Sequence, residues 1–185
     1  MGHMQTRIED IRYQDHKAAK FYRNLWRQSG LDPSNTSAFV WLMSQSNFVH
    51  RWLRLLLRPQ HGLYFRFKFL TVYHSLSGLD RLKRTVRGNR NKLIGHLAAE
   101  LLGTVAAARL KKTDSALRNA MAHYQLRNTP DHSFSPEDPI RDVVRALSPC
   151  PFEELDALLD GQLDAMSNAF RSIVSPGFFA RRFEG

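Results

Sequence analysis

Cysteine is nearly absent from the sequence, since Cys150 is the only one among 185 residues. A single cysteine cannot form a disulfide within the chain, and it cannot assemble a zinc site that needs several thiolates. Long apolar runs are missing as well, because arginine or lysine interrupts each candidate before the roughly 18 residues that a membrane span needs. These absences predict a soluble, cytoplasmic protein that makes no use of a membrane.

The signatures of several enzyme classes are also missing. There is no glycine-rich phosphate loop and no Gly-x-Ser-x-Gly nucleophile turn. Histidines are present, but those outside the two motifs described below form no pair at metal-ligand spacing with acids nearby. Apart from His3 within residues 1–4, they are His16, His50, His61, His74 and His132. We therefore predict no bound metal and no cofactor.

Positive charge, in contrast, is in excess. The chain has 27 lysines and arginines against 17 acids, a formal net charge of +10 and a pI of about 10.3. This excess favours a polyanionic partner such as nucleic acid. A basic run near the end of one predicted helix could contact RNA phosphates, or it could be a solvated helix face. Its members are Arg81, Lys83, Arg84, Arg87 and Arg90.

Length and composition predict a single domain. With 43% hydrophobic residues, the chain can bury one core, which we expect to span residues 5–176. Residues 1–4 resemble a cloning remnant, and the basic residues 177–185 are expected to form a loose tail. We see no internal repeat that would indicate a second unit.

Apolar residues recur at spacings of three and four along most of the chain, which predicts helices. The stripes cover residues 8–26, 39–56, 65–86, 93–105, 117–126, 140–147 and 155–173. Tyr64–Phe69 also alternates like a strand, but the stripe continues for about six turns, so length favours a helix. Thr113-Asp114-Ser115 is expected to separate two helices, with one longer helix as the alternative. The predicted fold is all-α, an up-and-down helical bundle with additional short helices.

The segment Leu117–His123 separates polar from apolar residues when it is placed on a helix. At about 100° per residue, Arg118, Asn119 and His123 fall within about 140° of one another. The small Ala122 lies in the same sector and leaves space there for a phosphate. The apolar residues on the opposite side can pack into the bundle. They are Leu117, Met121 and Tyr124.

Each polar member of this sector suits RNA cleavage. Histidine titrates near neutral pH and can take a proton from a 2′-hydroxyl or give one to a leaving 5′-oxygen. Arginine stays charged and can hold a phosphate through two parallel hydrogen bonds. Asn119 can orient the imidazole or bind the sugar-phosphate. Because the neighbouring 2′-hydroxyl is the nucleophile, the chemistry selects RNA over DNA and needs no metal.

Arg118-Asn119, three further residues and His123 resemble the signature of the HEPN superfamily, in which four to six residues separate arginine from histidine. HEPN domains are helical bundles that usually dimerise through this helix. The resemblance implies a homodimeric, metal-independent endoribonuclease that leaves 2′,3′-cyclic phosphate and 5′-hydroxyl ends. It also implies a toxin–antitoxin or antiviral setting, with a possible antitoxin or regulatory partner. In it, His123 is the general acid/base, Arg118 stabilises the transition state and Asn119 supports them.

One position departs from the pattern of those HEPN toxins that a nucleotidyltransferase silences. Their tyrosine lies two residues after the histidine, whereas here Gln125 has that position and Tyr124 directly follows His123. Control by nucleotidylation is therefore not predicted, and Tyr124 is interpreted as a core residue.

A second segment also matches the loose spacing. Arg90 and Asn91 precede His96, with five residues between arginine and histidine. On a helix the bulky Leu93 falls between Arg90 and His96, so this is the weaker alternative motif.

Two further interpretations of the Arg118–His123 segment stay open at this point. Its polar residues could be no more than the exposed side of an amphipathic helix. The domain could also bind RNA or dimerise without cleaving, as a regulatory part of a larger protein.

Overall fold

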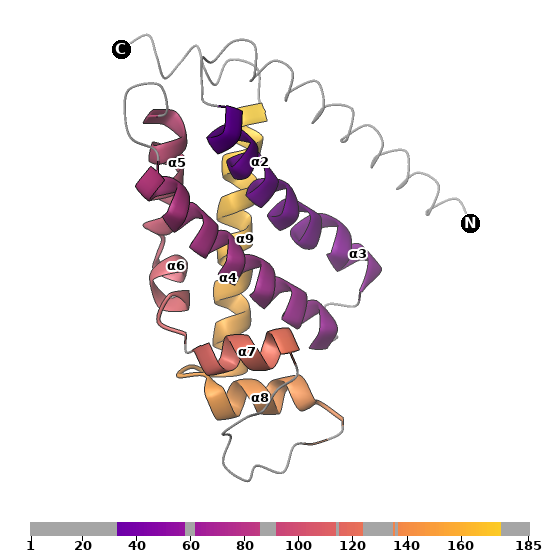
Figure 1. The fold of residues 1–185 in the computed structure, drawn as a ribbon. Coiled ribbons are helices and arrows are strands. Elements are labelled where there is room, and N and C mark those ends of the chain that lie inside the picture. Colours follow the sequence, from indigo (N-terminus) through magenta and orange to yellow (C-terminus); the bar gives the residue numbers. More distant parts are fainter. Residues whose placement is uncertain are drawn as a thin grey trace, which may run out of the picture.

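The computed structural model describes residues 33–57, 62–85, 92–113, 115–123, 135 and 137–174. Every secondary-structure element in these ranges is a helix (Figure 1), so the all-α prediction is confirmed. The expected first helix over 8–26 and the tail 177–185 lie outside the described residues. Within them, no helix combines the length and the apolar character that crossing a bilayer requires.

The second predicted stripe forms three consecutive helical segments, α2 (Pro33–Asn47), the π-helix η1 (Phe48–Leu53) and α3 (Arg54–Leu56). Proline at the start of α2 is compatible with the first turn, where a backbone N–H has no helical partner. Ser34 and Asn35, residue types that favour the position before a helix, lie within α2 instead.

The far end of this stripe differs from the prediction. Phe39 and Val49 are buried as expected, but Leu56 is 71% exposed. The wider turn of the π-helix rotates the residues that follow it away from the phase of a regular α-helix. A stripe counted at 3.6 residues per turn therefore misplaces Leu56.

Helix α4 (Gly62–Thr85) is the long helix predicted from the third stripe. The stripe residues in the described range are all buried: Phe65, Phe69, Val72, Leu76, Leu79 and Leu82. The strand alternative for Tyr64–Phe69 is wrong. Gly78 allows α4 to lie close against α2, because a Cβ at Gly78 would lie only 2.8 Å from Leu42 Cδ1.

The fourth stripe is interrupted, contrary to the prediction of one helix through Val105. It forms α5 (Lys92–Leu102) and α6 (Val105–Leu110), and Val105 is 74% exposed. Thr104 caps α6, since its side-chain oxygen accepts a hydrogen bond of 3.0 Å from Ala107 N–H. The buried Gln162 stabilises the end of α5 at this break, because its Nε2 donates a hydrogen bond of 3.0 Å to the carbonyl oxygen of Leu101.

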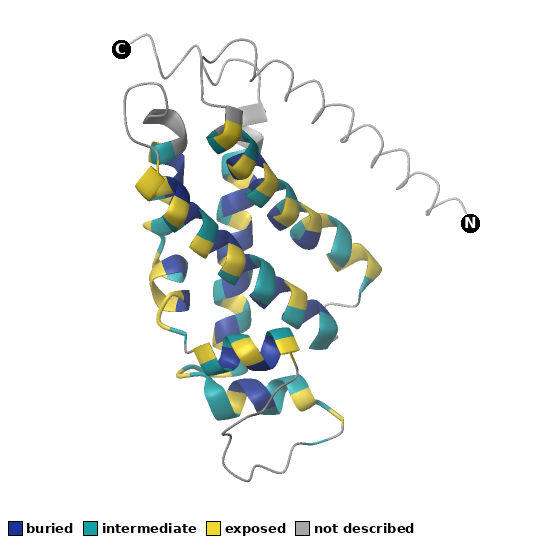
Figure 2. Cartoon of the chain, in the orientation of Figure 1, coloured by how far each residue is buried: buried dark blue, intermediate teal, exposed yellow. Residues whose placement is uncertain are grey.

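The predicted break before the motif segment is confirmed, because α6 ends at Leu110 and α7 (Ser115–His123) begins five residues later. The last two helices are α8 (Pro139–Leu147) and α9 (Phe152–Val174), close to their predicted bounds. Helix α9 contacts α2, α4, α5 and α6 and so lies at the centre of the bundle (Figure 1). Over residues 152–170 its buried residues alternate with more exposed ones (Figure 2).

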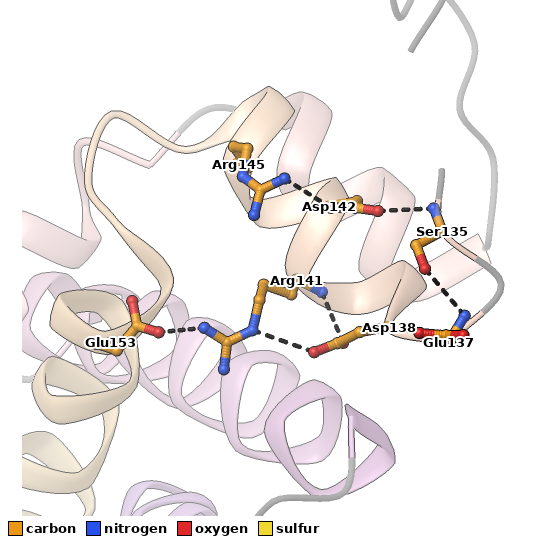
Figure 3. Close-up of polar contacts among 7 residues, drawn as sticks. All are labelled: Ser135, Glu137, Asp138, Arg141, Asp142, Arg145 and Glu153. Carbon is orange, nitrogen blue, oxygen red and sulfur yellow. Dashed lines mark hydrogen bonds and ion pairs between the residues drawn. The ribbon is translucent and has the colours of Figure 1, made fainter. Parts of the chain in front are cut away.

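A polar network joins the start of α8 to the start of α9 (Figure 3). Asp138 caps α8 by accepting 3.2 Å from Arg141 N–H. The Arg141 guanidinium donates to Asp138 at 3.1 Å and also to Glu153. Asp142 accepts 2.7 Å from Ser135 N–H and pairs with Arg145 at 3.0 Å. These bonds fix the end of the bundle against which α7 packs.

Candidate functional site

Helix α7 presents its polar residues outward, as the helical sector predicts. Leu117, Ala120 and Met121 are buried, whereas Asn119 and His123 are exposed. Tyr124 and Gln125 lie outside the described residues. The orientation of the amphipathic helix is therefore confirmed, and its assignment as a catalytic site stays a prediction.

Two contacts hold the Arg118 guanidinium. Its Nε and Nη2 donate to Asn119 Oδ1 at 3.0 and 2.5 Å. Its Cζ lies 5.7 Å from the centre of the Tyr73 ring, which belongs to α4. The sequence predicted that Asn119 acts on His123 or on RNA, whereas in the structure the Asn119 oxygen binds Arg118. The Nη1 group takes no part in these bonds.

His123 is the last residue of α7, where backbone carbonyls have no partner within the helix. Arg66 of α4 supplies that partner. Its Nη2 donates to the carbonyl oxygen of Ala122 at 3.0 Å, and its Nε donates to that of Met121. A cation at a helix C-terminus also interacts favourably with the helix dipole. Arg66 therefore fixes the turn that carries the exposed His123.

Sequence reasoning missed both residues of α4 that hold the motif. Arg66 and Tyr73 are seven residues apart, which puts them on the same side of α4. That spacing was available in the sequence. Nothing in it, however, showed that this side of α4 contacts α7, which is a property of the packing.

A small cavity continues from Tyr73 along the same side of α4. Its volume is about 280 Å³. It is lined by Tyr73, Leu76, Ser77, Asp80, Leu110 and Lys111. Because Tyr73 also lies under the Arg118 guanidinium, the cavity is adjacent to the candidate phosphate-binding group.

Asp80 is the acidic group of this cavity. Arg84 Nη2 lies 2.7 Å and Lys111 Nζ 3.5 Å from its carboxylate oxygens. Its partial desolvation favours the protonated form, but the positive charges of Lys111 and Arg84 outweigh this and hold the pKa of Asp80 below its usual value. Asp80 is therefore an anion at neutral pH.

The predicted RNA-binding residues separate into two groups. Arg81, Lys83 and Arg84 are exposed at the end of α4, and Arg84 pairs with Asp80. Arg81 also lines a larger groove of about 670 Å³ between α2 and α4, together with the exposed Trp41. The other two predicted residues, Arg87 and Arg90, lie outside the described residues.

The weaker alternative motif is described only in part. His96 is exposed on α5, while Arg90 and Asn91 lie outside the described residues. Elsewhere in the described ranges, no three His, Cys, Asp or Glu side chains are grouped as a metal-ligand set.

Across the described residues the fold is all-α, and α7 carries the half-buried Arg118 and the exposed His123. Comparison of the chain with protein-family models, with curated proteins and with solved structures gives no match. Membership of the HEPN superfamily therefore stays a prediction from the motif.

Proposed function

We propose that the protein is a HEPN-type endoribonuclease that cleaves single-stranded RNA without a metal ion. The observation that supports this best is that two residues of α4 contact the motif residues of α7 and the backbone that carries them. Arg66 fixes the turn that carries His123, and Tyr73 supports Arg118. One neighbouring helix therefore holds both the backbone just before His123 and the guanidinium of Arg118.

The reaction would use the two groups in different roles. Arg118 binds the phosphate between two nucleotides through its Nη1 edge and neutralises the charge that develops in the transition state. His123 takes the proton of the 2′-hydroxyl, whose oxygen attacks phosphorus. The bond from phosphorus to the 5′-oxygen breaks, and the leaving oxygen receives a proton. The products are a 2′,3′-cyclic phosphate and a 5′-hydroxyl.

Two copies of the chain would supply the acid and the base together. A single exposed histidine can give or take a proton, but the step needs one donor and one acceptor on opposite sides of the phosphorus. In a homodimer that pairs the α7 surfaces, one His123 acts as base and that of the second copy as acid. Control by an antitoxin or regulatory protein, in a toxin–antitoxin or antiviral setting, is part of the same proposal.

The direct test is incubation of the full chain with single-stranded RNA in excess chelator. We expect cleavage to cyclic-phosphate ends, and a loss on the order of 10²- to 10⁴-fold in His123→Ala. Arg118→Ala should lose activity similarly. His96→Ala is the matched control, because His96 is another exposed helical histidine that belongs to the weaker motif. No cleavage by the parent chain, or equal cleavage by His123→Ala, contradicts the proposal.

The same experiment identifies the alternative function. A regulatory domain that binds RNA or dimerises without turnover would retain the RNA intact. In that case Arg118→Ala weakens RNA retention, while His123→Ala leaves the RNA uncleaved, as the parent chain does.

A further inference from the structure

The cavity beside Tyr73 has walls that suit a nucleobase. Tyr73 supplies an aromatic ring, and Leu76 and Leu110 supply apolar surface. Single-stranded RNA is commonly recognised by stacking a base on an aromatic side chain and binding its edge through hydrogen bonds. Since Arg118 lies over the same Tyr73 ring, a base in the cavity would belong to a nucleotide next to the phosphate that Arg118 binds.

Asp80 has no evident use in holding phosphate. Its carboxylate is ionised and repels anions, yet it lies in this cavity on a protein with a net charge of +10. An ionised carboxylate only accepts hydrogen bonds, so it suits the N–H groups of a base edge. Asp80 Oδ2 already accepts a hydrogen bond of 2.7 Å from Arg84, and Lys111 Nζ lies 3.5 Å from Oδ1, so a base edge would share these oxygens with the two cations.

We infer that this cavity is a base-binding subsite and that Asp80 and Lys111 select guanine. The inference rests on the proposed action on RNA. The Watson–Crick edge of guanine presents two adjacent donors, N1–H and the N2 amino group, beside the O6 acceptor. The two carboxylate oxygens of Asp80 match the donors, and the Lys111 ammonium matches O6. Adenine and cytosine each offer a carboxylate only one donor group, and uracil offers one donor between two acceptors.

Binding to the inactive His123→Ala chain tests the inference without cleavage. The probes are labelled oligouridine hexamers in which one central base is guanine, inosine, adenine or cytosine. We expect the guanine probe to bind about tenfold more tightly than the adenine probe, as one bidentate base contact provides. Inosine lacks the N2 amino group and should lose most of this gain. These comparisons change only the RNA, so they do not depend on the folding of an Asp80 variant.

A second variant assigns the preference to Asp80. Asp80→Asn, made in the His123→Ala chain, keeps the side-chain shape but replaces one carboxylate oxygen by an amide NH2 group. The side chain then offers one acceptor and one donor, which suits the edge of adenine. We expect the guanine preference to vanish or to change to adenine, with oligouridine binding within about twofold of the parent. Asp164→Asn is the matched control, because Asp164 is an exposed aspartate on α9 whose Oδ1 lies 2.9 Å from His50 Nε2.

The possible failures are distinguishable. If the chain neither binds nor cleaves any RNA, both the proposed function and this inference are overturned. If it binds or cleaves RNA but treats guanine and adenine alike, or if Asp80→Asn keeps the guanine preference, only the inference is overturned.

Discussion

The guanidinium of Arg66 donates a hydrogen bond of 3.0 Å to the carbonyl oxygen of Ala122, the residue directly before His123. Replacing Arg66 by methionine should leave the C-terminal carbonyls of α7 without this partner. We expect a loss of about 1–2 kcal/mol in unfolding free energy, because bonds to charged groups are worth more than neutral ones. Urea denaturation measures it, and hydrogen exchange should increase at residues 121–123.

The Arg66→Met variant also separates positioning from binding. If Arg66 holds the turn that carries His123, then kcat for RNA should fall at least tenfold while RNA affinity changes little. Arg109→Met is the control, since Arg109 of α6 pairs with Glu154 of α9 and not with the C-terminal carbonyls of α7. Equal kcat values for the Arg66 and Arg109 variants would show that the α7 terminus needs no such support.

Tyr73 should act on Arg118 through its ring rather than through its hydroxyl. The guanidinium lies 5.7 Å from the ring centre, a distance at which cation–π attraction is worth about 0.5–1 kcal/mol at an exposed site. Tyr73→Phe is therefore expected to keep RNA affinity, and Tyr73→Leu to weaken it by about two- to fivefold. Fluorescence anisotropy with labelled RNA measures both, and equal effects of the two substitutions would rule out a role for the ring.

Lys68 is a buried cation that two aspartates of α9 neutralise. Its side chain is 2% exposed, and its Nζ lies 2.5 Å from Asp156 Oδ1 and 2.9 Å from Asp160 Oδ1. Because the aspartates keep some contact with water, we expect Lys68→Ala to cost about 2–3 kcal/mol, somewhat less than the loss of a fully buried partner. Lys111→Ala, which removes a half-exposed ion pair with Asp80, should cost under about 1 kcal/mol. Equal losses in denaturation would contradict this ranking.

The ionisation of Tyr64 should make the stability of the fold fall as the pH rises. Burial, reinforced by the negative charge of Asp160, raises the pKa of Tyr64 to about 12 from the ordinary 10.0. Between these values the unfolded chain releases the phenolic proton while the folded chain retains it. Stability from this group is thus complete below pH 10 and is lost as the pH rises through about 12.

The Tyr64→Phe variant tests this without disturbing the packing. The buried Tyr64 hydroxyl has no hydrogen-bond partner in the described structure. Its removal should therefore leave the neutral-pH stability unchanged or up to about 1 kcal/mol higher. The parent should lose more stability than the variant above pH 10, and parallel denaturation curves at high pH would contradict the assignment.

The sequence predicted those features of the fold that depend on one regular helix, and it predicted less well those that depend on a local interruption. The buried side of α4 followed from periodicity alone, since a stripe that persists from Phe65 to Leu82 needs only one regular helix. The break at Gly103-Thr104 had a local signal, a glycine followed by a capping residue, but the alanine-rich sequence around it obscured that signal.

For the candidate site, too, one part was predicted from the sequence and another part was not. The outward orientation of Arg118 and His123 followed from the spacing of Leu117 and Met121 within one helix. The supporting role of Arg66 could not be predicted, because it depends on which side of α4 meets the end of α7. Contacts between distant segments are set by packing, which a single sequence without related sequences does not reveal.

The π-helix η1 relates the exposure of Leu56 to the number of residues in this part of the chain. A π-helical turn accommodates more residues than an α-helical turn, as an inserted residue would require. Within η1 the chain still buries Val49 and places His50 Nε2 2.9 Å from Asp164. A chain with one residue fewer here could run as a regular α-helix and keep its remaining end, Leu56 included, in the same orientation, because one α-helical residue accounts for about 100° of turn. The extra residue in η1 thus explains why a count at the regular helical period misplaces Leu56, whatever the hydrophobicity of that leucine.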